Sequence, residues 1–154
     1  MAGTLTPERT AERLCELSAD ARAAVLLDAA GALAGVHGVP PERAEELAGL
    51  ARALFEAVDR ADRDIPGGPP EQVEAQVESG TVYASRTPRW TLAMVARRAA
   101  LSSLMLMDLR AVLAELEHGR QIRRSTAVEE PGAGEATEEG AAGELPVPEL
   151  GREP

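Results

Sequence analysis

Lysine is absent from this chain of 154 residues, and cysteine, histidine and aromatic residues are scarce. Without Lys, the phosphate-binding loop that ends in Gly-Lys-Ser or Gly-Lys-Thr is excluded. Cys15, His37 and His118 lie far apart in the sequence and supply too few ligands for a transition-metal site. We therefore expect no catalytic site, no metal and no cofactor, and predict that the chain is not an enzyme.

The charge is uneven along the chain, whose formal net charge is −10. Residues 128–154 hold eight Glu and one Arg, so the rest of the chain is nearly balanced. This distribution offers no basic face for nucleic acid or an anionic membrane. No apolar run reaches the roughly 18 residues of a membrane span. A lone Cys suits a reducing compartment, and the first residues do not resemble a leader, so we expect a cytoplasmic location.

Hydrophobic periodicity predicts three helices and five strands in the order α-β-β-α-β-β-β-α. The helices are expected at residues 7–18, 41–62 and 101–119, and the strands at 22–28, 32–37, 72–78, 81–86 and 90–96. Short connections favour antiparallel neighbours, because a parallel pair needs a crossover of about a dozen residues. The fold class is therefore predicted to be α/β, of the α+β type, with one five-stranded antiparallel sheet.

The ends of the first and last helices have their own signals. Thr6 is predicted to cap the first helix with its side chain, and Pro7 suits the first helical position. Gly119 is the expected end of the last helix. Beyond it, a composition rich in Glu, Gly, Ala and Pro is typical of disorder. We expect a folded domain over residues 1–119 and a disordered acidic tail over residues 120–154.

The long helix at 41–62 has more apolar surface than one contact with a sheet requires. Its apolar residues cover about half of the circumference, whereas a single docking face needs roughly 100°. Arg43 is the only charged residue inside the apolar arc. The strand at 72–78 alternates strictly and should lie at a sheet edge, where unpaired backbone groups attract a partner strand. A symmetric dimer would bury both surfaces, and its interface is predicted to contain Leu50, Leu54, Ala57, Ala61, Val73, Ala75 and Val77.

Three stretches resemble the bacterial branch of the roadblock/dynein light chain family, regulators and partners of Ras-like small GTPases. They are Ser18–Gly31, Val39–Leu47, and Pro70–Gly80 followed by Trp90–Ala96. The resemblance implies a roadblock/profilin-like sandwich, with the long helix on one face of the sheet and the two terminal helices on the other. It also implies a homodimer in which the third strands pair edge to edge and the long helices pack together.

Two functions are open at this point. The first is a non-enzymatic homodimeric adaptor that binds a Ras-like small GTPase and modulates its activity or location. The alternative is a module that senses a small molecule, or a scaffold of a signalling complex without a GTPase partner. Arg97 and Arg98 follow the last strand, where they either reach a partner's phosphate or lie in a solvated loop.

Overall fold

The computed structural model describes residues 3–63, 66–67 and 70–144, with side chains described as far as residue 125. The predicted order of elements is confirmed. The elements are α1 (Pro7–Leu17), β1 (Ala21–Leu27), β2 (Leu33–His37), α2 (Pro41–Asp62), β3 (Gln72–Val77), β4 (Gly80–Arg86), β5 (Thr91–Ala96) and α3 (Ser102–Glu144). The chain divides into two compact units, residues 1–117 and 118–154, which are described separately.

All five strands form one antiparallel sheet in the order β2-β1-β5-β4-β3. The strand with apolar residues on both faces, β5, lies at the centre, and the alternating strand β3 lies at an edge, as the patterns predict. The β1–β2 turn depends on Asp28, whose Oδ1 accepts hydrogen bonds from the backbone N–H groups of Ala30 and Ala32 at 2.9 and 3.0 Å. Gly31 closes this turn with φ = +86°, where a side chain would be strained.

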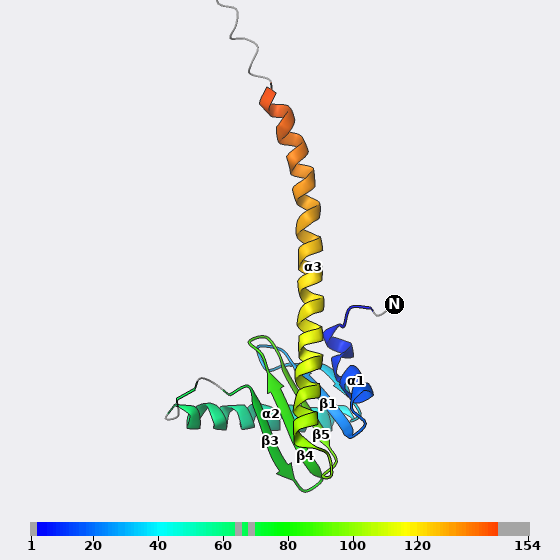
Figure 1. Ribbon diagram of the computed structural model, residues 1–154, viewed down its shortest axis with the longest axis vertical. Coiled ribbons are helices and arrows are strands. Elements are labelled where there is room, and N and C mark those ends of the chain that lie inside the picture. The colour runs from blue at the N-terminus through cyan, green and yellow to red at the C-terminus, as the bar shows by residue number, and fades with distance from the viewer. Residues whose placement is uncertain (1–2, 64–65, 68–69, 145–154) are drawn as a thin grey trace, which may run out of the picture. The chain divides into compact units, whose positions relative to one another are not determined.

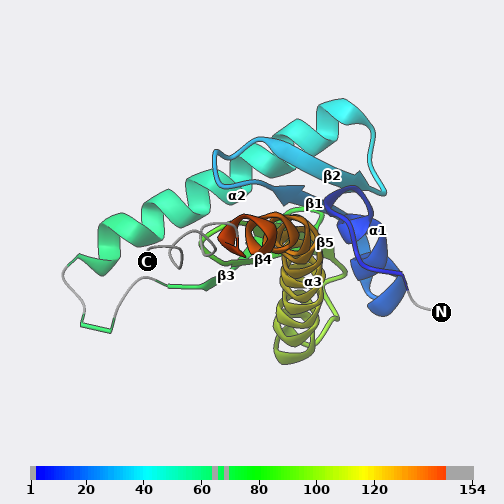
Figure 2. The same ribbon diagram turned by 90° about the horizontal axis from the view of Figure 1, so that it is seen from above.

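Each face of the sheet has its own core, because successive side chains of a strand point to opposite faces. Ala24 and Leu26 of β1 pack with α1 and α3, whereas Val25 and Leu27 pack with α2. The helix α2 therefore covers one face, and α1 and the first turns of α3 cover the other (Figures 1 and 2). The expected sandwich is confirmed.

Two predictions about helix ends are wrong. Thr6 does occupy the N-terminal cap position of α1, but its side chain makes no capping hydrogen bond; instead the Thr10 hydroxyl donates to the Thr6 carbonyl at 2.8 Å. The last helix does not end at Gly119, because α3 continues to Glu144. One Gly destabilises a helix by about 1 kcal/mol relative to Ala, which does not stop a helix between turns of good helix formers.

Asp108 is a buried carboxyl group of α3, with 8% of its surface exposed. It lies beside Ser18, the residue at the C-terminal end of α1. Burial raises the pKa of Asp108, and a hydrogen bond from Ser18 partly opposes the shift. The pKa of Asp108 is therefore higher in the folded protein than in the unfolded chain. Below the unfolded pKa, the protonated carboxyl group contributes fully to the stability of the folded state. This contribution is lost as the pH rises through the folded pKa.

We predict that Asp108→Asn raises the melting temperature at pH 7, because the neutral amide removes a buried negative charge and keeps the size of the side chain. The gain should shrink as the pH falls from 7 to 4, because wild-type Asp108, whose pKa is raised, takes up a proton more readily than an ordinary carboxyl group. Thermal melts across this pH range test the prediction. Glu16→Gln on the exposed surface of α1 is the control. A gain that is equal at both pH values would contradict the role of ionisation.

Candidate interaction surface

The helix α2 carries two adjacent apolar stripes. The first is buried against the sheet and consists of Ala44, Leu47, Ala48, Ala51 and Phe55. In the second, Leu50 and Leu54 are half-buried at the margin of the core, and Ala57 and Ala61 are exposed. The second stripe contains all four α2 residues that the sequence assigns to an interface.

The three β3 residues assigned to the interface lie on the same side of the sheet as α2. Val73 pairs with Ala84 and Ala75 with Val82, and these two β4 residues belong to the core under α2. Directly paired residues in an antiparallel sheet point to the same face. Val73, Ala75 and Val77 are half-buried, although β3 is an edge strand. We call these three residues and the second stripe of α2 the lateral surface.

A groove of about 600 Å³ lies at one end of the lateral surface, between α2 and the end of the β3–β4 hairpin. Leu50 of α2, Val77 of β3 and the sheet residues Val82 and Val95 line its apolar part. Charged side chains also line the groove, and they are Arg22, Arg43 and Glu46. The Arg43 side chain makes no hydrogen bond or ion pair with any residue that the structure describes.

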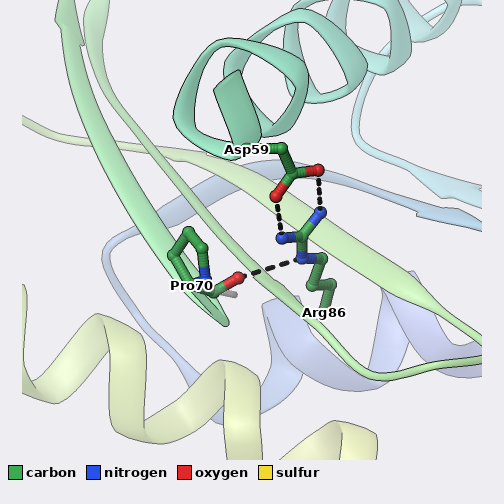
Figure 3. A network of polar contacts seen from close by, with 3 residues as sticks. All are labelled: Asp59, Pro70 and Arg86. Atoms are coloured by element: carbon green, nitrogen blue, oxygen red, sulfur yellow. Dashed lines mark hydrogen bonds and ion pairs between the residues drawn. The ribbon is translucent and has the colours of Figure 1, made fainter. Parts of the chain in front are cut away.

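The C-terminal half of α2 is fixed to the sheet by Arg86, the last residue of β4 (Figure 3). Both terminal nitrogens of its guanidinium donate to the Asp59 carboxylate, one of them at 3.0 Å. Its Nε donates to the Pro70 carbonyl at 3.0 Å, and its Cζ lies 4.4 Å from the centre of the Phe55 ring. The guanidinium lowers the pKa of Asp59. We call these contacts the Arg86 clamp.

Arg97 and Arg98 already have partners within the chain. Arg97 lies 3.4 Å from the Asp20 carboxylate, and Arg98 donates to the carbonyls of Val77 and Glu78 at 3.1 and 3.2 Å. Both side chains remain exposed. They hold the β3–β4 hairpin and the start of β1 rather than joining the second stripe of α2, and contact with a partner stays a prediction.

The sequence patterns predicted no role for Arg22, Arg43 or Arg86. Arg43 had a signal, since it is the only charge inside the apolar arc of α2. Arg86 had none, because Asp59 is 27 residues away along the chain and is brought to it only by the fold. No group of three His, Cys, Asp or Glu side chains suited to a metal occurs among the described residues. Cys15 is half-buried, and burial raises the pKa of its thiol.

The chain matches one protein family in sequence, and its fold is similar to that of several solved structures. The Roadblock/LC7 domain model matches residues 10–96. A Roadblock/LC7 domain from Streptomyces avermitilis is 22% identical, with 80% of this chain and 99% of that chain covered and a TM-score of 0.63. No curated protein sequence matches.

Two MglB structures have the same fold. The one from Myxococcus xanthus is 18% identical, with coverage of 77% and 88% and a TM-score of 0.62. An MglB with a tetrameric arrangement is 17% identical, with coverage of 77% and 99% and a TM-score of 0.58. Schizosaccharomyces pombe profilin is 11% identical, with coverage of 73% and 98% and a TM-score of 0.51. These similarities confirm the roadblock/profilin-like fold.

We predict that Arg86→Ala destabilises the protein more than Asp59→Asn does. Arg86→Ala removes the contact with Phe55, worth about 0.5–1 kcal/mol, and the hydrogen bond to Pro70 as well as the ion pair. Asp59→Asn weakens only the ion pair. Urea denaturation at pH 7 gives both values. Because the pKa of Asp59 is lowered, its contribution should be lost as the pH falls below about 4. Equal destabilisation by the two variants would contradict the clamp.

Proposed function

Because the chain belongs to the Roadblock/LC7 family, we propose that it acts as a homodimer that binds a Ras-like small GTPase and modulates its activity or its location. The observation that carries the proposal is the lateral surface, which joins an open sheet edge to an apolar stripe of α2. In this function the chain is a regulator and scaffold, not an enzyme, and it works in the cytoplasm.

Self-association is supported by the character of the lateral surface. The β3 edge has unpaired backbone groups, and a second strand satisfies them. Ala57 and Ala61 are exposed and small, so two helices can approach closely along this stripe. An isologous contact uses the same patch on both copies and leaves no open end. One related MglB structure has a tetrameric arrangement, which is consistent with self-association in this fold.

The GTPase partner is supported by family membership and by what the chain lacks. The bacterial branch of the family is expected to act with Ras-like GTPases. Phosphoryl transfer needs a phosphate cradle, a cation and a positioned water, and this sequence has neither a Lys nor a phosphate-binding loop. In this proposal the GTPase partner hydrolyses GTP, and this chain provides binding surfaces that modulate the activity of the partner. No helix in residues 3–63, 66–67 and 70–144 is long and apolar enough to cross a membrane.

The groove supports the second candidate, a module that senses a small molecule. Its volume of about 600 Å³ falls within the range of small-molecule sites, and Arg22 and Arg43 offer donors to an anionic ligand. Most of its lining is apolar, and two of the lining residues, Leu50 and Val77, belong to the lateral surface, so a ligand there competes with a second copy of the chain. A ligand retained in native mass spectrometry of the monomer would favour this candidate over the homodimer.

We predict a dimer in solution, for which light scattering at micromolar concentration gives twice the 16.2 kDa chain mass. Leu50→Asp should raise the dimer dissociation constant roughly a hundredfold or more, because it buries a carboxylate in the interface. Leu17→Asp is the matched control, since Leu17 is an exposed leucine of α1 on the other face of the sheet. A wild-type chain that stays monomeric at this concentration would remove the proposal's main support.

We predict that the dimer binds the Ras-like GTPase encoded nearest to its gene, and that the protein alone hydrolyses no GTP. Calorimetry with the GTPase in both nucleotide states measures the affinity. Leu50→Asp should weaken binding at least tenfold, whereas Leu17→Asp should not change it. Equal binding by a folded Leu50→Asp monomer would contradict recognition through the dimer. If the dimer binds the GTPase in neither of its two nucleotide states, the result would favour the module that senses a small molecule.

A further inference from the structure

The first turns of α3 expose large apolar side chains on the side of the helix that faces away from the sheet. Met105 and Leu109 are buried in the core beneath these turns. Leu101, directly before the helix, is 67% exposed, and Leu104 and Met107 are 40% and 58% exposed. Figure 2 looks along α3 and shows the strands on one side of these turns and α1 beside them. Residues three apart on a helix are neighbours, so the exposed side chains form one patch, which is typical of contact with another protein.

The patch continues along α3 as a seam of four exposed residues, Leu104, Met107, Ala111 and Ala114. Their spacing of three, four and three residues is that of the positions along which two helices pack in a coiled coil. The two alanines leave room for the large side chains of a second seam. A groove of about 620 Å³, with Met107 in its wall, lies beside the seam. We call these four residues and Leu101 the outer face of α3.

Charges beside the outer face favour a second copy of the chain as its occupant. Arg110 lines the same groove, and its exposed side chain makes no hydrogen bond or ion pair with any described residue. The exposed Glu74 carboxylate of β3 accepts a hydrogen bond from the Ser102 hydroxyl at 3.0 Å, but it has no cationic partner within the described part of the chain. Ser102 and Arg110 lie about two turns apart on α3. An antiparallel second copy brings each of the two charges to the opposite charge of its partner.

Three antiparallel registers about a two-fold axis bring the two seams into contact, and they differ by shifts of one heptad. An axis at residue 109 places the two Arg110 side chains beside each other, and this repulsion is destabilising. An axis at residues 112–113 places Leu104 opposite Gln121 of the partner subunit and leaves Leu101 outside the contact. An axis at residues 105–106 has neither fault.

We propose that the outer face of α3 is a second contact surface between copies of this chain, in which two α3 helices pack antiparallel about a two-fold axis at residues 105–106. In this register Leu104 lies opposite Met107 of the partner subunit. Leu101 lies opposite Ala111 of the partner subunit, so that a large side chain meets a small one. All the large apolar side chains of the outer face are then covered.

The charges favour the same register. Arg110 lies opposite Ser102 of the partner subunit, and therefore beside Glu74 of the partner subunit. The two-fold axis forms this ion pair twice. The two Arg110 residues are separated by nine positions, which is about 13 Å along the helix axis at a rise of 1.5 Å per residue, so their repulsion is screened.

This contact goes beyond the proposed homodimer, because the two surfaces lie on opposite faces of the sheet. Val73 packs with the core under α2, whereas the Nε2 of the neighbouring Gln72 donates to the Leu106 carbonyl of α3 at 3.1 Å. One chain can therefore use both surfaces at once, and the outer faces would join two homodimers into a tetramer. The outer face offers no strand pairing and only a few large side chains, so we expect a dissociation constant on the order of 100 µM.

The dependence of mass on concentration tests the second contact. Light scattering of the full chain should rise from twice the 16.2 kDa chain mass at micromolar concentration towards four times that mass at several hundred micromolar. Met107→Asp should abolish the rise. Val36→Asp, its matched control, changes an exposed valine of β2 on the other face of the sheet and should rise like wild type. A wild-type mass that stays at its micromolar value, or an equal rise in Met107→Asp, would overturn the proposal.

Leu50→Asp separates this contact from the proposed homodimer. With its lateral surface disrupted, this variant should be monomeric at micromolar concentration and approach twice the chain mass at several hundred micromolar. A Leu50→Asp chain that stays monomeric at the higher concentration would show that the outer face does not self-associate. Failure of the proposed homodimer would appear differently, as a wild-type chain that is already monomeric at micromolar concentration.

Charge reversal in the Leu50→Asp background tests the register. Arg110→Glu should weaken association about fivefold to tenfold, and adding Glu74→Arg should restore it to within about twofold. Arg43→Glu makes the same charge change at another exposed Arg, on the other face of the sheet, and should have no effect. Circular dichroism confirms that each variant is folded. Association that Glu74→Arg fails to restore would overturn the axis at residues 105–106.

Discussion

The structure depends on a mismatch of widths between one helix and a five-stranded sheet. Strands lie about 4.8 Å apart, so five of them span roughly 20 Å, whereas a helix with its side chains is about 10–12 Å wide. Two helices, α1 and α3, cover one face, and α2 alone covers the other. It packs on β1 and β5, and Val73, Ala75 and Val77 of β3 stay half-buried beside it. The three β3 residues of the lateral surface lie on the part of the sheet that α2 is too narrow to cover.

The same mismatch explains why α2 needs the Arg86 clamp. A helix that crosses only part of a sheet has few apolar contacts at its far end, where Ala57 and Ala61 are exposed. Arg86 supplies the missing attachment with one planar group that binds the Asp59 carboxylate in two places and stacks on Phe55. A Lys ammonium is a compact charge, so it can neither bind both carboxylate oxygens with parallel hydrogen bonds nor lie flat against an aromatic ring. The clamp therefore uses the specific chemistry of Arg in a chain that has no Lys.

Sequence reasoning succeeded where a feature depends on neighbouring residues. The bounds of α2, the central place of β5 and the edge position of β3 follow from periodicity and from Pro or Gly at the turns. The second stripe of α2 was also predictable, because its excess of apolar surface is visible on a helical wheel. Features that join distant segments were missed: the Arg86 clamp links β4 to α2, and Asp108 is buried only because α3 packs beside the end of α1. The end of α3 was mispredicted because Gly119 and the loss of apolar periodicity after it were given more weight than the helix formers that follow Gly119.

Thermodynamic coupling connects the lateral surface to the proposed GTPase. If the GTPase recognises a surface that exists only in the dimer, its binding and the dimerisation of this chain are linked equilibria. Any factor by which dimerisation strengthens GTPase binding is also the factor by which the GTPase strengthens dimerisation. In the proposed dimer, the exposed alanines and half-buried strand residues of the lateral surface would bury little area per residue compared with large aliphatic side chains. A dimer of moderate strength suits this coupling, because a partner can shift the population of an equilibrium only when both states are populated.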